Sequence, residues 1–266
     1  MKRLLLILLL SVGARTLSAQ QNQPIEPAAK SLTAVVKLDT LNWVDQSRKR
    51  LVPVAIYGPE KPALSKTGKL NQVIILNHGY GQNQWGSFKA YSYLANFLAS
   101  KGYTVVSIQH ELATDDLLPT AGKPIETRWP NWERGVQNIL FVIKQLKKTR
   151  PDLDYKHLSL IGHSNGGDMV MLFATQHPEL VACVISLDNR RMPFPRVSKP
   201  RIYSLRSSDQ PADEGVLPSS DQQQHFGIEL VKLKSTIHNE MDANGKDWQH
   251  QEINQLVLDF LIKSQD

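Results

Sequence analysis

Apolar runs and amphipathic segments alternate along most of this chain of 266 residues. Short continuous apolar runs that end in polar or glycine-rich residues are typical of strands covered on both faces. Apolar residues at helical spacing lie between or after these runs, at about residues 87–100, 132–148, 164–176 and 248–262. Such alternation predicts βαβ crossovers and an α/β domain built on a mostly parallel, doubly wound sheet. The strands are expected at residues 73–77, 104–108, 157–161, 181–187, 201–205 and 230–233.

The first part of the pattern differs, because β-forming residues cluster on both sides of a polar turn. Residues 32–43 and 51–57 carry them, and residues 45–49 form the turn. This arrangement predicts an antiparallel hairpin that precedes the parallel strands. Residues 58–71, with prolines at positions 59 and 62, are expected to form a surface loop.

Two connections depart from the regular alternation. Residues 111–131 form a long segment rich in Pro, Asp and Thr, and a loop of this length inside a compact domain is often functional. Residues 188–200 lie between two expected strands and are short and punctuated by proline, which leaves no room for a large cap domain. We therefore expect an open, shallow site.

The N-terminus has the composition of an export signal. Lys2 and Arg3 precede an apolar run at residues 4–10, and small and polar residues follow. The run is too short to span a bilayer, and no cysteine lies near its end to be lipidated. We expect residues 1–20 to be a signal peptide, residues 21–31 a flexible leader and residues 32–266 one folded domain. The mature protein would be periplasmic or extracellular, without a stable membrane anchor.

Composition and charge change this picture little. Apolar residues make up 41% of the chain, which suffices for a substantial core. The 31 basic and 25 acidic residues give a formal charge of +6, and removal of the three basic residues of the signal leaves +3. Basic clusters at residues 48–50 and 144–150 lack interleaved aromatic residues, so we interpret them as solvated faces and expect no nucleic-acid partner. The single cysteine, Cys183, is expected in the core.

A motif with a specific chemistry follows the apolar run at residues 157–161. The segment Gly162-His163-Ser164-Asn165-Gly166 has the spacing Gly-x-Ser-x-Gly and leads into an expected helix. A serine at a sharp strand-to-helix turn needs neighbours without side chains two residues to either side, which Gly162 and Gly166 provide. In this context the pattern marks a nucleophile elbow, and Ser164 is the candidate nucleophile.

A serine hydroxyl needs a base within hydrogen-bond reach, and after such an elbow the chain order is serine, acid, histidine. His238 follows the last expected strand and precedes the last helix, so we expect it to be the base. The other histidines beyond Ser164 are weaker candidates. His177 ends a helix, His225 lies in a Gln-rich polar stretch and His250 lies on the last helix.

Two aspartates at strand ends could orient the imidazole of His238. Asp209 follows the penultimate expected strand, and Asp188 closes the strand before it. We favour Asp209, because its loop approaches the loop of His238 most directly, and keep Asp188 as the alternative. Asp188 could instead pair with a neighbouring arginine, and Asp209 could serve as a turn residue before a proline. Asp213 is a third, poorer candidate.

Acyl transfer also requires donors for the oxyanion, usually the N–H after the nucleophile and one from a loop after an earlier strand. Asn165 provides the first donor by its position. For the second we choose the N–H of Tyr80, in the glycine-containing loop that emerges from the strand at residues 73–77. Three tryptophans could line an acyl or alcohol site, with core packing as an equal alternative. They are Trp85, Trp129 and Trp132.

Together these residues resemble the α/β-hydrolase superfamily over nearly the whole chain from about residue 32. His78-Gly79 is similar to the oxyanion loop of that superfamily, and residues 162–167 are similar to its elbow. The resemblance implies the α/β-hydrolase fold and a Ser-His-acid triad.

Within the superfamily, the chain looks like esterases of the dienelactone-hydrolase and platelet-activating-factor-acetylhydrolase type. Acetylhydrolases of this type use an acid at the position of Asp188, whereas most α/β-hydrolases use the position of Asp209. A dienelactone hydrolase proper has a cysteine nucleophile, so Ser164 departs from that pattern. The segments that carry the resemblance are residues 50–57, the His-Gly loop, residues 109–111 and residues 187–193.

The sequence therefore predicts an exported serine hydrolase that cleaves small-molecule carboxylic esters through an acyl-enzyme on Ser164. A peptidase or amidase on the same scaffold and a non-catalytic binding protein are the alternatives, although a peptidase usually needs a cap or an extra domain. Zinc-ligand spacing, a dinucleotide-binding glycine pattern and a phosphate loop are all missing from the sequence, so we expect neither metal nor cofactor.

Overall fold

The computed structural model describes residues 35–59 and 72–265. The expected signal peptide and leader, and most of the expected loop at residues 58–71, lie outside these residues.

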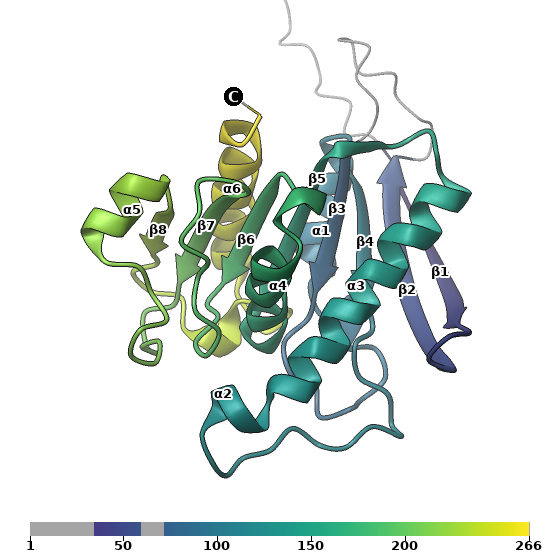
Figure 1. Cartoon of the computed structure of the whole chain (residues 1–266). Helices are drawn as coiled ribbons and strands as arrows, with labels where there is room; N and C mark the ends of the chain where they lie inside the picture. The colour runs from purple at the N-terminus through teal and green to yellow at the C-terminus, as the bar shows by residue number, and fades with distance from the viewer. Residues whose placement is uncertain (1–34, 60–71, 266) are drawn as a thin grey trace, which may run out of the picture. The chain divides into compact units, whose positions relative to one another are not determined.

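Eight strands form one mixed sheet in the order β1-β2-β4-β3-β5-β6-β7-β8 (Figure 1). β1 and β2 form an antiparallel hairpin and β2 is antiparallel to β4, whereas all other neighbours are parallel. The predicted mostly parallel sheet with an N-terminal hairpin is therefore confirmed. The strands are β1 (Val36–Asp45), β2 (Arg50–Pro59), β3 (Gln72–Asn77), β4 (Thr104–Ile108), β5 (Asp154–His163), β6 (Cys183–Leu187), β7 (Arg201–Arg206) and β8 (Glu229–Lys232).

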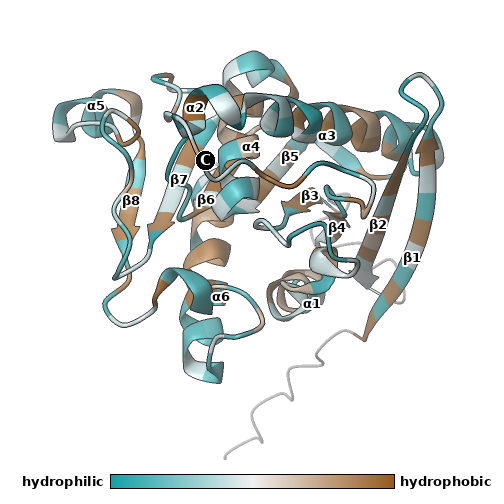
Figure 2. Ribbon diagram, turned by 90° about the horizontal axis from the view of Figure 1, so that it is seen from below, coloured by the Kyte–Doolittle hydropathy of each residue, from teal (hydrophilic) through white to brown (hydrophobic). Residues whose placement is uncertain are grey.

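Helices cover both faces of this sheet (Figures 1 and 2). α3 (Trp129–Thr149) and α4 (Ser164–Gln176) pack on one face, and α1 (Ser92–Ser100) and α6 (Asp247–Lys263) pack on the other. Successive residues of β3 enter the two cores alternately, Val73 and Ile75 on the α3 side and their neighbours on the α1 side. Because both faces are covered, the strands have the continuous apolar composition that predicted them. Cys183 is fully buried, as expected.

Two short elements, η1 and α2, and the start of α3 differ from the sequence-based expectation. The helix expected at residues 87–100 is divided into a short 3₁₀ turn, η1 (Ser87–Lys89), and α1. The long connection expected at residues 111–131 ends earlier, because α2 (Pro124–Thr127) and the first turn of α3 lie within it. Pro130 occupies that first turn, where a missing N–H costs no helical hydrogen bond.

The hydrophobic pattern does not predict α5 (Ser220–Phe226), because this helix has no apolar residues at helical spacing. It is stabilised instead by a capping box, in which the Ser219 hydroxyl accepts from the N–H of Gln222 and the Gln222 side chain bonds back to Ser219. The spacing of these two residues was the available signal.

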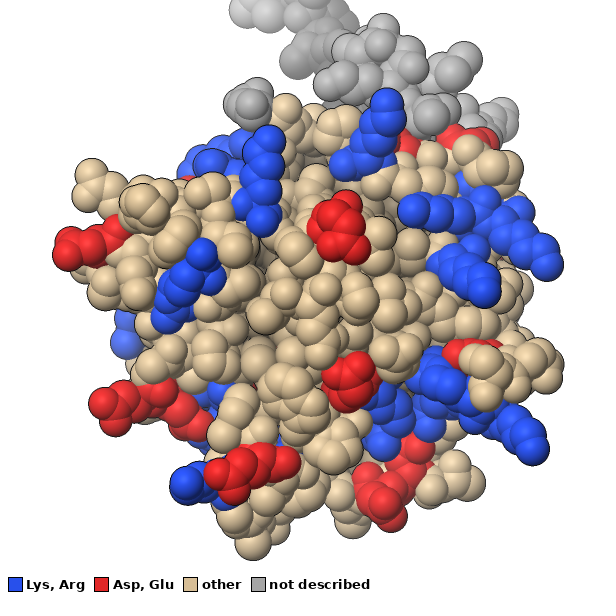
Figure 3. Space-filling model, in the orientation of Figure 1, with Lys and Arg blue, Asp and Glu red and all other residues tan. Residues whose placement is uncertain are grey.

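The distribution of surface charge and the connection between β6 and β7 show what surrounds the ends of the strands. Lys, Arg, Asp and Glu side chains are scattered among uncharged residues over the face seen in Figure 3. Residues 188–200 connect β6 to β7 without a helix, so this connection forms no helical cap over the described strands. Within the described ranges, the helices are too short or too polar to cross a membrane.

The loop that follows β3 rests on a buried polar network. The ring of His78 bonds through Nδ1 to the carbonyl of Gly79 at 2.6 Å and accepts the N–H of His110 at Nε2, at 2.9 Å. His110 bonds in turn to the Asn77 side chain, which donates to the carbonyl of Ile161. Burial lowers the pKa of His78 to about 4 and that of His110 well below its ordinary value, so both rings are neutral at neutral pH.

The turn from β5 into α4 packs tightly on the same loop. A Cβ atom at Gly162 would overlap the backbone of Gly166, and one at Gly166 would overlap the carbonyl oxygens of Asn77 and His78. Ser164, between the two glycines, has a left-handed φ of 51°. The need for glycine on both sides of the serine is therefore confirmed.

We predict that Gly166→Ala lowers the free energy of unfolding by about 1–3 kcal/mol, because the new methyl group must displace the loop after β3. Urea unfolding measures this change. Gly58→Ala is the matched control, since its Cβ would meet only the Thr104 hydroxyl, at 4.0 Å, and we expect a change within about 0.5 kcal/mol. Equal stability of the two variants would contradict this packing account.

We also predict that His78 makes the fold sensitive to acid. Its folded pKa lies below its unfolded value, so below about pH 6.5 the unfolded chain takes up a proton that the folded chain excludes, and stability falls toward about pH 4. The contribution is at most about 1.4 kcal/mol per pH unit.

Urea unfolding between pH 4 and pH 7 tests this dependence. We expect a shallower slope for His78→Gln than for the parent, and no change of slope for a variant of the exposed His225, His225→Gln. Identical slopes for the two variants would exclude His78 as the cause.

Candidate active site

Ser164 lies at the carboxyl end of the parallel strands, where β5 turns sharply into α4. This edge is where ligands usually bind in doubly wound sheets. The left-handed backbone at Ser164 is strained for a residue with a side chain, and it directs the hydroxyl away from the helix.

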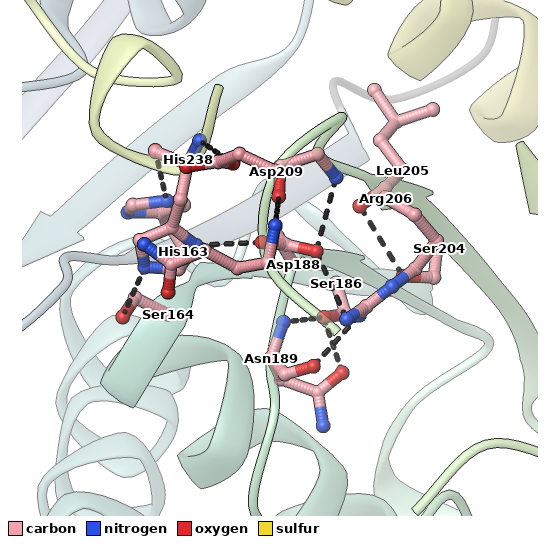
Figure 4. Close-up of polar contacts among 12 residues, drawn as sticks. His163, Ser164, Ser186, Asp188, Asn189, Ser204, Leu205, Arg206, Asp209 and His238 are labelled. Carbon is pink, nitrogen blue, oxygen red and sulfur yellow. Dashed lines mark hydrogen bonds and ion pairs between the residues drawn. The ribbon is translucent and has the colours of Figure 1, made fainter. Parts of the chain in front are cut away.

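Two further side chains form a hydrogen-bonded chain with this serine (Figure 4). His238 Nε2 lies 2.9 Å from Ser164 Oγ, and His238 Nδ1 lies 2.6 Å from Asp188 Oδ2. Because an ionised carboxylate can only accept, Nδ1 carries the proton and Nε2 is free to accept the serine proton. His238 opens the 3₁₀ turn η3 (His238–Glu240), which follows β8.

The preferred acid of the sequence analysis does not contact the imidazole. Asp209 Oδ1 instead accepts the backbone N–H of His238 at 2.8 Å. The loop of Asp209 does approach the loop of His238, as expected. However, Asp209 contacts the backbone of His238, whereas the His238 side chain extends past Asp209 toward Asp188 at the end of β6 (Figure 4). The preference for Asp209 over Asp188 is therefore wrong in this structure. Asp213 is not part of this hydrogen-bonded chain of side chains either, because it forms an ion pair with Arg191.

Asp188 is fully buried, and three groups compensate its charge. Besides His238, the N–H of Ser207 donates to Oδ1 at 3.0 Å, and Arg206 Nη2 lies 2.9 Å from the same oxygen as an ion pair. Burial by itself would raise the pKa of Asp188, but the hydrogen bond from His238 and the charge of Arg206 outweigh it and lower the pKa. The carboxylate therefore stays ionised and can stabilise a protonated His238.

His163, an unspecified position of the elbow motif, supports the loop of the base. Its Nε2 lies 3.1 Å from the carbonyl of His238, and its Nδ1 lies 2.6 Å from the hydroxyl of Tyr91. Burial, together with the neighbouring His238, lowers the pKa of His163 to about 3. His163 is therefore a neutral donor that holds the loop, and only the three-dimensional structure reveals this role.

The two residues expected to provide N–H donors lie beside the nucleophile. Asn165 is in the first turn of α4, where backbone N–H groups have no acceptor within the helix. Tyr80 lines the same two hollows as Ser164. Its loop is packed directly on the elbow, since a Cβ at Gly79 would lie 3.3 Å from the Cβ of Ser164.

Two buried side chains after β4 hold the Tyr80 loop. Glu111 Oε2 accepts the N–H groups of Gly81 and Asn83, at 2.9 and 3.0 Å. Gln109 Oε1 accepts two more N–H groups, at 3.2 and 3.3 Å, from residues 86 and 88. The sequence feature that indicates this role is the polar cluster at residues 109–111, which is one of the segments that carry the family resemblance.

The three tryptophans proposed as substrate walls do not line the hollows at Ser164. Trp132 is fully buried, and its Nε1 donates to the Asn165 side chain at 2.8 Å, so it fixes the start of α4. Trp129 is 41% exposed, and Trp85 is 62% exposed beside a separate surface hollow near residues 48–51. The substrate-wall hypothesis is therefore wrong for these residues, whereas the alternative of core packing is confirmed for Trp132, because tryptophan next to a functional loop does not specify which way the ring points.

Two small hollows meet at Ser164. One of about 230 Å³ is bordered by the loop at residues 118–120, the start of α3 and residues 190–191. The other, of about 260 Å³, is bordered by Tyr91, Asp242 and the loop after β3. The long connection after β4, expected to be functional, therefore does contribute to the site. In the described part of the chain, no group of three His, Cys, Asp or Glu side chains could hold a metal ion.

Comparisons with known proteins relate the chain to one family model and to several solved structures. The family model described as serine aminopeptidase, S33, matches residues 68–187. None of the curated protein sequences is significantly similar to the chain.

Solved structures resemble the fold at low sequence identity. An esterase of Rhizomucor miehei is 15% identical with a TM-score of 0.63, over 89% of this chain and 86% of its own. A putative dienelactone hydrolase of Klebsiella pneumoniae subsp. pneumoniae is 14% identical with a TM-score of 0.61, over 86% and 99%. An acylaminoacyl peptidase of Pyrococcus horikoshii is 14% identical with a TM-score of 0.62, over 88% of this chain but 42% of its own. The shared fold shows that the chain has the α/β-hydrolase fold, and the family match over residues 68–187, which contain the Gly-x-Ser-x-Gly elbow, is to serine hydrolases of that fold.

Proposed function

We propose that the protein is an exported esterase that hydrolyses small carboxylic esters through an acyl-enzyme on Ser164. The observation that carries the proposal is the unbroken hydrogen-bonded chain from Ser164 Oγ through His238 to the buried carboxylate of Asp188. A serine hydroxyl becomes an effective nucleophile when a neutral imidazole accepts its proton and a carboxylate orients that imidazole.

Each group has a role in the proposed reaction. His238 Nε2 takes the proton of Ser164 as the hydroxyl attacks the ester carbonyl, and Asp188 stabilises the imidazolium. The N–H groups of Tyr80 and Asn165 donate to the oxyanion of the tetrahedral intermediate. His238 then returns the proton to the leaving alcohol, and later accepts one from the water that hydrolyses the acyl-enzyme.

A peptidase is the second candidate, because the matching family model is described as a serine aminopeptidase. An aminopeptidase must bind a positively charged amino terminus next to the scissile bond. Of the two hollows at Ser164, the one bordered by residues 118–120 carries Arg128, Arg190 and Arg191, which repel such a group, so only the hollow bordered by Asp242 could accept it. The connection between β6 and β7 also contains no helices that could select a peptide. The lack of such helices in this connection favours an ester.

Export is proposed from the sequence of residues 1–20, with its basic start and short apolar run. The chain has a single cysteine, so it can form no intramolecular disulfide, even in an oxidising compartment.

The proposed activity is tested by comparing p-nitrophenyl acetate with alanine p-nitroanilide as substrates. We expect hydrolysis of the ester to exceed that of the anilide, and we expect a fluorophosphonate probe to label the parent but not Ser164→Ala. A higher rate on the anilide would favour the peptidase. Absence of labelling in the folded parent would exclude Ser164 as the nucleophile.

The assignment of the acid gives a second prediction. Asp188→Asn should lower kcat/KM by about 10³–10⁴-fold, because the amide cannot stabilise the imidazolium and favours the wrong tautomer of His238. Asp209→Asn is the matched control and should cost less than about tenfold, because its amide oxygen can still accept the N–H of His238. Kinetics on p-nitrophenyl acetate distinguish the two, and a larger loss for Asp209→Asn would reverse the assignment.

A further inference from the structure

One of the two hollows at Ser164 is lined by three arginines. Arg128 lies at the start of α3, and Arg190 and Arg191 follow β6, so the chain brings them together from distant positions. All three side chains are half-buried. Burial, and after it the neighbouring charge of Arg191, lower the pKa of both Arg128 and Arg190, and the charges of Asp168 and Asp213 partly oppose this effect.

Two of these guanidinium groups have no counter-charge in contact. Arg191 forms an ion pair with Asp213, whereas Arg128 Nε donates only to the carbonyl of Pro119, at 3.2 Å. Within the described residues, the side chain of Arg190 makes neither a hydrogen bond nor an ion pair shorter than 4.0 Å. Most other arginines of the fold do contact a carboxylate, namely residues 48, 50, 134, 150 and 206.

Asp168 also borders this hollow, but its hydrogen bonds come from backbone N–H groups and the Asn189 side chain rather than from an arginine side chain. Its Oδ1 accepts the N–H groups of Arg191 and Met192, at 3.0 and 2.9 Å. Burial raises the pKa of Asp168 to about 6. Asp168 therefore orients the segment that carries the arginines, and its single charge cannot balance both Arg128 and Arg190.

The second hollow has the opposite character. It is bordered by Asp242 together with Tyr91, Ser87 and the loop after β3, and its lining includes neither Lys nor Arg. An ester that spans Ser164 therefore meets positive charge on one side only. A half-buried guanidinium without a partner is costly, and a carboxylate or phosphate that binds it with two parallel hydrogen bonds removes that cost.

We infer that the natural ester carries an anionic group, a carboxylate or a phosphate, on one side of its scissile bond, and that Arg128 and Arg190 bind this group. The inference rests on the proposed esterase function. The hollow is small, about 230 Å³, so only a few atoms separate the anion from the ester carbonyl.

The test uses pairs of esters that differ only in charge. p-Nitrophenyl hydrogen adipate and p-nitrophenyl methyl adipate place the difference on the acyl side, and 4-acetoxybenzoate and methyl 4-acetoxybenzoate place it on the alcohol side. We expect the anionic member of one pair to have at least a tenfold higher kcat/KM, and the responding pair identifies the side that faces the arginines. Two anionic esters that are no better than their neutral partners would overturn the inference.

Variants connect the preference to the arginines. Arg190→Gln should lower the anionic-to-neutral ratio of kcat/KM by about tenfold or more. Arg190→Lys keeps the charge but loses the two-pronged contact, and should give an intermediate ratio. Lys199→Gln removes an exposed charge from the same connection and should leave the ratio unchanged.

The outcomes separate the inference from the function on which it rests. If neutral esters are hydrolysed but Arg190→Gln and Lys199→Gln give the same ratio as the parent, the anion site is disproved and the esterase stands. If none of the four esters is hydrolysed by folded protein that a fluorophosphonate labels, the esterase proposal fails, and the inference fails with it.

Discussion

The carboxylate of Asp188 is wholly buried at the end of β6, and the geometry of the site follows from how its charge is compensated. Burial of an unpaired carboxylate costs several kcal/mol, so its partners must be in place when the protein is folded. They come from β7, as Arg206 and the N–H of Ser207, and from the turn after β8, as His238. The same constraint that keeps the carboxylate ionised therefore aligns three strand ends and aims His238 at Ser164.

Beneath these residues, the loop after β3 is held by polar groups that are themselves buried. Gln109 and Glu111 follow β4 and accept four backbone N–H groups of that loop. Burial raises the pKa of Glu111, and the two backbone N–H groups that it accepts oppose this effect. These hydrogen bonds fix the backbone of the loop that packs against Ser164.

Features with a local physical cause could be predicted from the sequence. The strands are apolar because helices cover both faces, and Ser164 was identified by glycines whose Cβ atoms would overlap neighbouring backbone. Features that depend on the direction of a side chain could not be predicted. Asp209 and Asp188 both stand at strand ends near His238, and only the path of the loop decides that one meets the backbone and the other the ring. For the same reason, the burial of Trp132 could not be inferred.

The polarity of the two hollows determines how this site can select a substrate. A small hollow offers little apolar area, and one methylene in an apolar pocket changes selectivity only by about 10–200-fold. A site with hydrogen-bonding and charged groups discriminates more strongly, because a wrong substrate leaves those groups desolvated and unpaired. Arg128 and Arg190 on one side and Asp242 on the other are such groups. Under the proposed esterase function, selection would therefore rest on the charge pattern of the ester on either side of Ser164 rather than on the length of an apolar chain.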